Sequence, residues 1–199
     1  MRDAENIREV EQLLTLHSSH FTPLMGFIFW PKSSRYVSEH PAYIPHKARR
    51  VGVFVNEDIE LVRRIAEDYA LDFIQLHGSE SPDYIQQLRD WSIIKAFNIA
   101  TADDLEATKP YEGIAYYFLF DTKAQLPGGS GQQFDWSILE AYTGDTPFLL
   151  SGGIGPDDAE RVKIYHHPKC VGIDLNSKFE LSPAMKDVTA LARLLNGIE

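Results

Sequence analysis

Seven short apolar runs, separated by segments with helical periodicity, most constrain how this 199-residue chain can fold. The runs have the length of strands and are rich in β-branched and aromatic residues. Because most of their residues are apolar and do not alternate strictly with polar ones, the runs are typical of parallel strands whose two faces are both covered. The predicted strands cover residues 24–30, 50–56, 71–77, 92–98, 114–121, 148–152 and 171–175.

The segments between the runs carry recognisable helix starts. Asp3 can cap a helix that has Ile7 and Val10 on one face, and Ser81 followed by Pro82 is a strong start signal. Thr101 can cap another helix. Each predicted strand is therefore followed by a helix or by a loop of helical length.

This alternation predicts an α/β protein of the TIM (β/α)8 barrel class. A closed barrel needs eight strands, whereas seven are visible, and the missing one is the first. The alternative is an open doubly wound sheet, but a glycine pair after a late strand favours the barrel. No linker, repeat or low-complexity tract interrupts the sequence, so we expect residues 1–199 to form a single barrel domain that is incomplete at its N-terminus.

Composition excludes several classes of partner. The net charge is −10, from 19 basic and 29 acidic residues, which argues against binding to nucleic acid or to an anionic membrane surface. No apolar run approaches the roughly 20 residues that span a bilayer, and the charged first residues do not resemble a secretory signal. The single cysteine cannot form an internal disulfide and fits a reducing compartment. We expect a cytoplasmic protein whose partner is a small molecule.

Two consecutive strand ends have the character of a phosphate site. Gly152 and Gly153 follow the sixth run, and Asn176 and Ser177 follow the seventh. Glycines let the backbone approach an anion, and the N–H groups at a helix start favour negative charge. In a βα-barrel, the loops after the last two strands are the usual phosphate site.

Three side chains near strand ends could carry chemistry. Asp121 ends the fifth run, where a partly desolvated carboxyl can act as a general acid, although an aspartate that only caps a turn fits equally well. Arg35 can bind a carboxylate with two N–H groups, but from the sequence a solvated loop arginine is the better interpretation. His77 ends the third run, and it either contacts the ligand or bonds the loop backbone.

The remaining candidates are weaker. Gly128 and Gly129, next to Asp121, indicate either a loop that closes over substrate or an ordinary turn. Asp174 would repel a phosphate unless it faces amides or a substrate hydroxyl. Cys170 lies four residues earlier, or ~13 Å away in a strand, so packing is a better role for it than catalysis. No metal-ligand spacing, phosphate-binding P-loop or nucleophile elbow is present.

These motifs, taken in order, resemble the phosphoribosylanthranilate isomerase family, and the resemblance runs essentially from end to end. It rests on residues 26–38, 51–56, 74–78, 120–123, 128–131, 134–136, 148–153 and 172–177. It implies an Amadori rearrangement of a phosphorylated substrate without metal or cofactor. It also implies that Asp121 is the general acid, that Arg35 binds the anthranilate carboxylate with His77 nearby, and that the turns at 152–153 and 176–177 hold the phosphate.

Two features depart from the family pattern. The family opens with a strand of the form Lys-x-Cys-Gly whose cysteine is the general base, and residue 1 already lies beyond that point. Lys178 stands where the family has glycine, so it either adds a cation near the phosphate or narrows the loop. We expect the natural protein to begin upstream of Met1.

If the short chain is the product, we expect exposed strand edges to cause self-association, low solubility or inactivity. The alternative functions are another phosphate-binding barrel enzyme, such as a sugar-phosphate epimerase or a thiamine-phosphate synthase, and a form that binds ligand without turnover.

Overall fold

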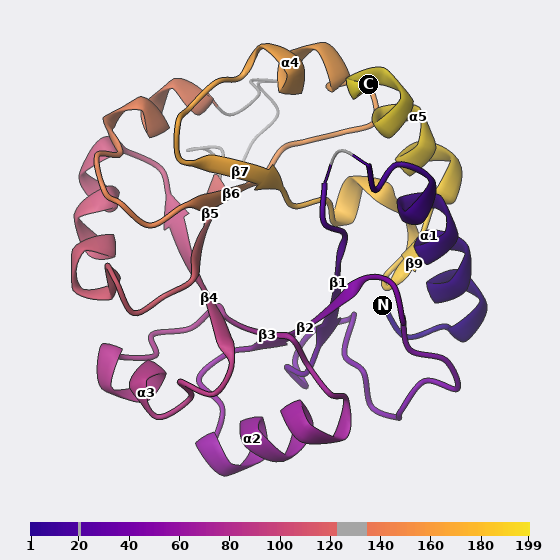
Figure 1. Cartoon of the computed structure of the whole chain (residues 1–199), viewed down its shortest axis with the longest axis horizontal. Helices are drawn as coiled ribbons and strands as arrows, with labels where there is room; N and C mark the ends of the chain where they lie inside the picture. Colours follow the sequence, from indigo (N-terminus) through magenta and orange to yellow (C-terminus); the bar gives the residue numbers. More distant parts are fainter. Residues whose placement is uncertain (20, 123–134) are drawn as a thin grey trace.

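Seven parallel strands in sequential order surround a central axis in the computed structural model (Figure 1). The structure describes residues 1–19, 21–122 and 135–199. The strands are β1 (Leu24–Ile28), β2 (Arg49–Phe54), β3 (Phe73–Leu76), β4 (Ser92–Ile99), β5 (Tyr117–Thr122), β6 (Phe148–Ser151) and β7 (Cys170–Ile173). A doubly wound sheet would reverse its strand order, whereas a barrel does not. The order therefore confirms the predicted barrel class and all seven predicted strands.

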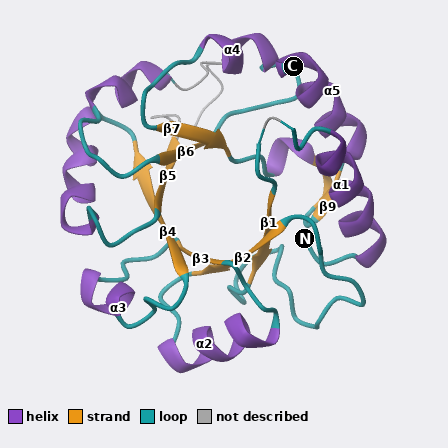
Figure 2. Ribbon diagram, viewed as in Figure 1, coloured by secondary structure: helices purple, strands orange, loops and turns teal. Residues whose placement is uncertain are grey.

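Helical segments lie outside the ring of strands (Figure 2). They are α1 (Ala4–Leu16), α2 (Ile59–Asp68), α3 (Pro82–Gln86), α4 (Ala159–Ile164) and α5 (Val188–Ile198), with 3₁₀ helices η1 (Ala102–Tyr111), η2 (Trp136–Ala141) and η3 (Ser177–Phe179). Asp3 caps α1 by accepting from Asn6 N at 2.8 Å, and Ser81 caps α3 by accepting from Tyr84 N at 3.2 Å. Thr101 begins η1, not an α-helix. Over the described ranges, no helix has both the length and the hydropathy of a membrane span.

Apolar side chains form two layers, one on each face of the curved sheet. Along β5, Phe118 and Phe120 belong to the larger cluster between the sheet and the helices, whereas Leu119 belongs to a smaller cluster. The smaller cluster lies on the inner face of the sheet and consists of Val51, Ile94, Ala96, Leu119 and Leu149. Because successive side chains in a strand point to opposite faces, Asp121 faces the interior, as Leu119 does.

The sheet is open between β1 and β7, which form no ladder with each other in the described residues. A short hairpin of β8 (Glu180–Ser182) and β9 (Met185–Lys186) follows β7, and Figure 1 shows β9, α1 and α5 beside this gap. Asn6 joins α1 to the hairpin, since its side chain donates to Lys186 O at 2.8 Å and accepts from Lys186 N at 2.7 Å. The main-chain nitrogen of Met1 donates to Gly26 O at 2.6 Å, so residue 1 lies beside β1. The N-terminal segment therefore lies between β1 and the hairpin, and hydrogen bonds from Met1 and Asn6, not a β-ladder, connect the two sides of the gap.

Candidate active site

A cavity of about 1410 Å³ occupies the barrel interior and extends to the gap between β1 and β7. Its polar lining includes a group of residues at or just beyond the carboxyl ends of the strands: Arg35, His77, Asn98, Asp121, Asp174 and Asn176. Other polar lining residues, among them Arg49 and Ser92, lie at the amino ends. Active sites of βα-barrels lie at this end. The fold thus brings together in one cavity four of the residues predicted as site residues: Arg35, His77, Asp121 and Asn176.

Asp121 stands in a row of polar residues that crosses three neighbouring strands. The register pairs it with Asn98 of β4 on one side and with Ser151 of β6 on the other. Ser151 Oγ donates to Asp174 Oδ2 at 2.9 Å, so a hydroxyl of the protein meets that carboxylate. Two carboxyl groups, those of Asp121 and Asp174, therefore line the same cavity.

The two predicted phosphate turns are adjacent. Gly152 and Gly153 have φ angles of 88° and 73°, a left-handed conformation that favours glycine. They follow β6, which pairs with β7, and Lys178 Nζ donates to Gly153 O at 2.6 Å across the two turns. Of the four predicted turn residues only Asn176 lines the cavity, since Gly152, Gly153 and Ser177 are not among its lining residues.

His77 follows β3 and also lines the cavity. The side-chain amide of Gln75 donates to His77 Nε2. Burial lowers the pKa of the His77 imidazole, and the charges of Asp174 and Asp121 oppose this shift only in part. The ring is therefore neutral at neutral pH, and a neutral imidazole can both accept and donate a hydrogen bond.

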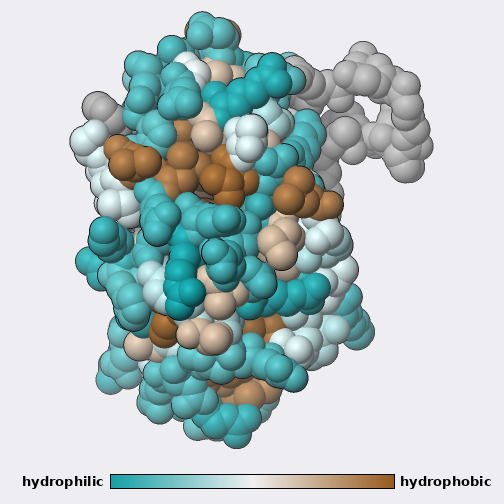
Figure 3. All heavy atoms as spheres, turned by 90° about the vertical axis from the view of Figure 1, so that its right-hand side faces the viewer, coloured by the Kyte–Doolittle hydropathy of each residue, from teal (hydrophilic) through white to brown (hydrophobic). Residues whose placement is uncertain are grey.

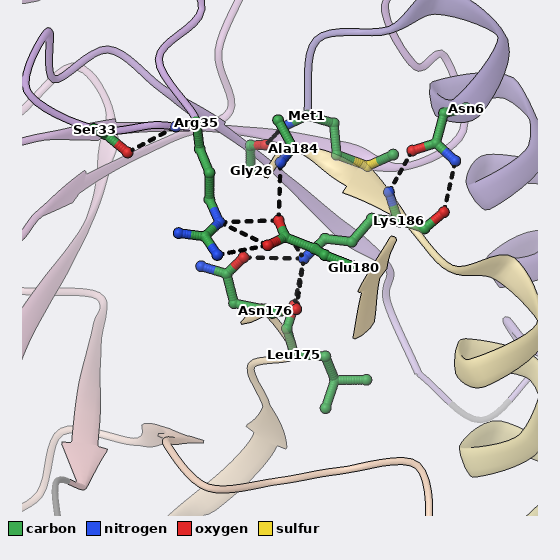
Figure 4. A network of polar contacts seen from close by, with 10 residues as sticks. All are labelled: Met1, Asn6, Gly26, Ser33, Arg35, Leu175, Asn176, Glu180, Ala184 and Lys186. Atoms are coloured by element: carbon green, nitrogen blue, oxygen red, sulfur yellow. Dashed lines mark hydrogen bonds and ion pairs between the residues drawn. The ribbon is translucent and has the colours of Figure 1, made fainter. Parts of the chain in front are cut away.

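Arg35, in the loop after β1, is paired across the gap with Glu180 of β8 (Figure 4). Glu180 also lies 3.6 Å from Lys186 Nζ, which donates to Leu175 O at 3.2 Å and to Asn176 Oδ1 at 3.0 Å. The sequence did not single out Glu180 or Lys186. They lie in the hairpin β8–β9, which has no strong local signal because each strand has only two or three residues.

Neither the predicted glycine loop nor the single cysteine belongs to the described part of the cavity lining. Gly128 and Gly129 lie outside the described residues. Cys170 begins β7, at the end opposite Asp174, and is not a lining residue of the cavity. Burial raises the pKa of its thiol. In the part of the chain that the structure describes, no three His, Cys, Asp or Glu side chains form a metal-binding group.

Comparisons with known proteins agree on one family. The family model "N-(5'phosphoribosyl)anthranilate (PRA) isomerase" matches residues 3–196. A curated N-(5'-phosphoribosyl)anthranilate isomerase from Parabacteroides distasonis is 47% identical, over 100% of this chain and 90% of its own length. The phosphoribosyl anthranilate isomerase of Thermotoga maritima superposes with a TM-score of 0.76 at 27% identity, covering 100% of this chain and 98% of that one.

One solved structure of the same kind carries a ligand. It is a phosphoribosyl anthranilate isomerase in complex with reduced 1-(o-carboxyphenylamino)-1-deoxyribulose 5-phosphate. It superposes with a TM-score of 0.75 and covers 100% of this chain and 98% of its own. At 24% identity, this likeness concerns the fold.

Proposed function

Because the chain belongs to the N-(5'-phosphoribosyl)anthranilate isomerase family, we propose that it converts N-(5'-phosphoribosyl)anthranilate into 1-(2-carboxyphenylamino)-1-deoxyribulose 5-phosphate, a step in tryptophan biosynthesis. The observation that carries this proposal is the family match over residues 3–196. The interior cavity supports it, because its polar groups lie where barrel enzymes hold their substrates.

The proposed reaction moves hydrogen within the substrate and needs no cofactor. Asp121 donates a proton to the furanose ring oxygen, and the bond from that oxygen to C1 breaks. The nitrogen lone pair forms a C1=N double bond as the ring opens. A base then removes the proton from C2, the electron pair left behind forms a C1=C2 bond, and the C1=N electrons return to nitrogen. The resulting enol becomes the C2 ketone as its hydroxyl loses a proton and C1 gains one. In the family this base is a cysteine on the strand that precedes the equivalent of β1. Cys170, at the opposite end of β7, does not take that role.

The remaining proposed site residues bind the two ends of the substrate. The phosphate binds at the turns 152–153 and 176–177, where backbone N–H groups and Lys178 supply positive charge. Arg35 binds the anthranilate carboxylate, and neutral His77 lies near the same part of the cavity. On the family resemblance, Gly128 and Gly129 are also proposed as substrate-binding residues.

Product formation tests the function. We expect the polypeptide as its gene encodes it, with any residues ahead of Met1, to convert N-(5'-phosphoribosyl)anthranilate into the deoxyribulose phosphate, measured by chromatographic separation of the two. N-ribosylanthranilate, which lacks the phosphate, is the control and should have a much lower kcat/KM. No product from the phosphorylated substrate would contradict the proposal, and calorimetric binding of the reduced product without turnover would indicate a ligand-binding protein.

We also propose that residues 1–199 act as a single barrel domain in the cytoplasm and that this polypeptide self-associates through the edges of β1 and β7, which form no ladder with each other in the described residues. Edge strands with unpaired backbone groups promote association. Val171 on β7 is 53% exposed, and Leu16 and Leu181 are 81% and 72% exposed. Figure 3 shows apolar surface among hydrophilic residues on the side of α1 and α5.

Sedimentation velocity tests the association. We expect the 199-residue polypeptide to form species larger than a monomer, in a proportion that rises with concentration. Val171→Lys should reduce that proportion, because a charge on an edge strand opposes pairing. Circular dichroism of the variant controls for its fold. A monomer at every concentration tested would refute the association.

A further inference from the structure

Glu180 is a buried carboxylate placed between two cations at the gap between β1 and β7 (Figure 4). Its side chain is only 4% exposed. Burial alone would raise the pKa of Glu180, but hydrogen bonds from Arg35 and the charge of Lys186 lower it below the usual value. Glu180 is therefore ionised at neutral pH, although the reaction proposed above gives it no role.

The contacts of Glu180 use one side of the Arg35 guanidinium. Arg35 Nε lies 3.0 Å from Oε1 and 2.8 Å from Oε2 of Glu180, and Nη2 lies 2.6 Å from Oε2. A guanidinium has a second pair of parallel N–H groups, formed by Nη1 and Nη2. Within the described ranges, no group accepts a hydrogen bond from Arg35 Nη1. Because Arg35 lines the cavity, this second pair is available to a carboxylate bound there.

Lys186 compensates the charge of Glu180. Its ammonium lies 3.6 Å from Glu180 Oε1 and is held by Leu175 O and by both oxygens of Asn176. The N–H of Ala184 donates to Glu180 Oε1 at 3.2 Å. Two cations therefore flank one carboxylate, so Lys186 offsets the repulsion that Glu180 would exert on a second carboxylate bound by Arg35.

We propose that Glu180 is a positioning residue, which fixes the Arg35 guanidinium so that its Nη1 and Nη2 groups meet the carboxylate of the anthranilate ring. This inference rests on the proposed function. Two effects oppose each other when Glu180 loses its charge: the positive potential at the site rises, but a long and flexible side chain loses its orientation. Ordering such a side chain on binding weakens affinity by ~2- to 10-fold, so we expect the loss of orientation to dominate.

Calorimetry with two ligands measures this role. The first ligand is reduced 1-(o-carboxyphenylamino)-1-deoxyribulose 5-phosphate. The second is the same compound without the carboxylate on its ring. We expect Glu180→Gln to lower the affinity for the first ligand by ~5- to 10-fold and to leave the affinity for the second unchanged. Equal weakening of both ligands, no change, or tighter binding of the first would overturn the inference.

Further variants separate the possible causes. Glu180→Asp keeps the charge but is one methylene shorter, so it should also lower the preference for the ligand that carries the ring carboxylate. It serves as the test if Glu180→Gln does not fold. Glu106→Gln removes a carboxylate from an exposed pair with Lys109 and should change neither affinity.

Arg35→Lys separates a failure of this inference from a failure of the proposed site. It keeps the charge but lacks the paired N–H groups. If Arg35→Lys loses the carboxylate preference and the Glu180 variants do not, the positioning role alone is wrong. If Arg35→Lys also keeps the preference, the proposed assignment of Arg35 is wrong and the role of Glu180 falls with it.

Discussion

Replacing Asp121 by asparagine is expected to lower kcat by about two to four orders of magnitude, which is the range for loss of a general acid. Asparagine has nearly the same size and can still accept a hydrogen bond, but it has no proton of suitable acidity for the ring oxygen. Asp121 faces the interior and lines the cavity, so the amide would occupy the place of the acid. We expect the affinity for the reduced product to change by less than about tenfold, because the acid acts mainly in the transition state.

Steady-state kinetics and calorimetry on the same preparations make this measurement. The polypeptide should include any residues that the gene encodes ahead of Met1. Asp90→Asn is the matched control, because Asp90 is exposed and does not line the cavity, and it should leave kcat unchanged. A kcat for Asp121→Asn within about threefold of the parent would remove Asp121 from the proposed mechanism.

The strands were predictable because each is a local signal. In the run of residues 114–121 every residue before Asp121 is apolar or aromatic, and burial on both faces of a parallel strand favours that pattern. The period of two then determines which end residue faces the interior once the strand is known. Asp121 could therefore be identified from the sequence, whereas its alignment with Asn98 and Ser151 depends on pairings between strands that the sequence does not state.

The partner of Arg35 could not be predicted in this way. Arg35 and Glu180 are separated by 145 positions, and Glu180 lies in a hairpin strand of only three residues. Neither hydrophobic periodicity nor turn chemistry relates residues so far apart. The sequence predicts a solvated or substrate-binding arginine, whereas the structure pairs Arg35 with the buried carboxylate of Glu180.

The burial of Lys95, in contrast, has a signal in the sequence. It lies in the apolar run of residues 92–98, and a charged residue at such a position is rarely fully buried unless it is paired. In the structure its side chain is 2% exposed and Glu80, its partner, is 1% exposed. The pair links β4 to the segment that carries His77.

Lys95→Met is expected to lower the free energy of unfolding by about 3–5 kcal/mol, the usual cost of removing one partner from a buried ion pair. Lys95 Nζ lies 3.4 Å from Glu80 Oε2 and donates to Leu76 O at 3.2 Å and Gly78 O at 2.8 Å. Methionine has a similar length, so packing is largely kept, but the Glu80 carboxylate and these carbonyls lose their cation. His77 lies between the two carbonyls in sequence, so we also expect weaker binding of the reduced product.

Urea unfolding of four variants tests this cost. Lys109→Met, in an exposed pair whose two side chains are each 69% exposed, is the matched control and should cost no more than about 1 kcal/mol. Glu80→Gln keeps an acceptor for the N–H groups of Asn56 and Gly78, which donate to Glu80 Oε1 at 2.7 and 3.2 Å. The double variant Lys95→Met, Glu80→Gln should therefore be more stable than Lys95→Met alone, because it leaves no unpaired charge in the interior. If Lys95→Met costs as little as Lys109→Met, the buried pair does not hold the turn that carries His77.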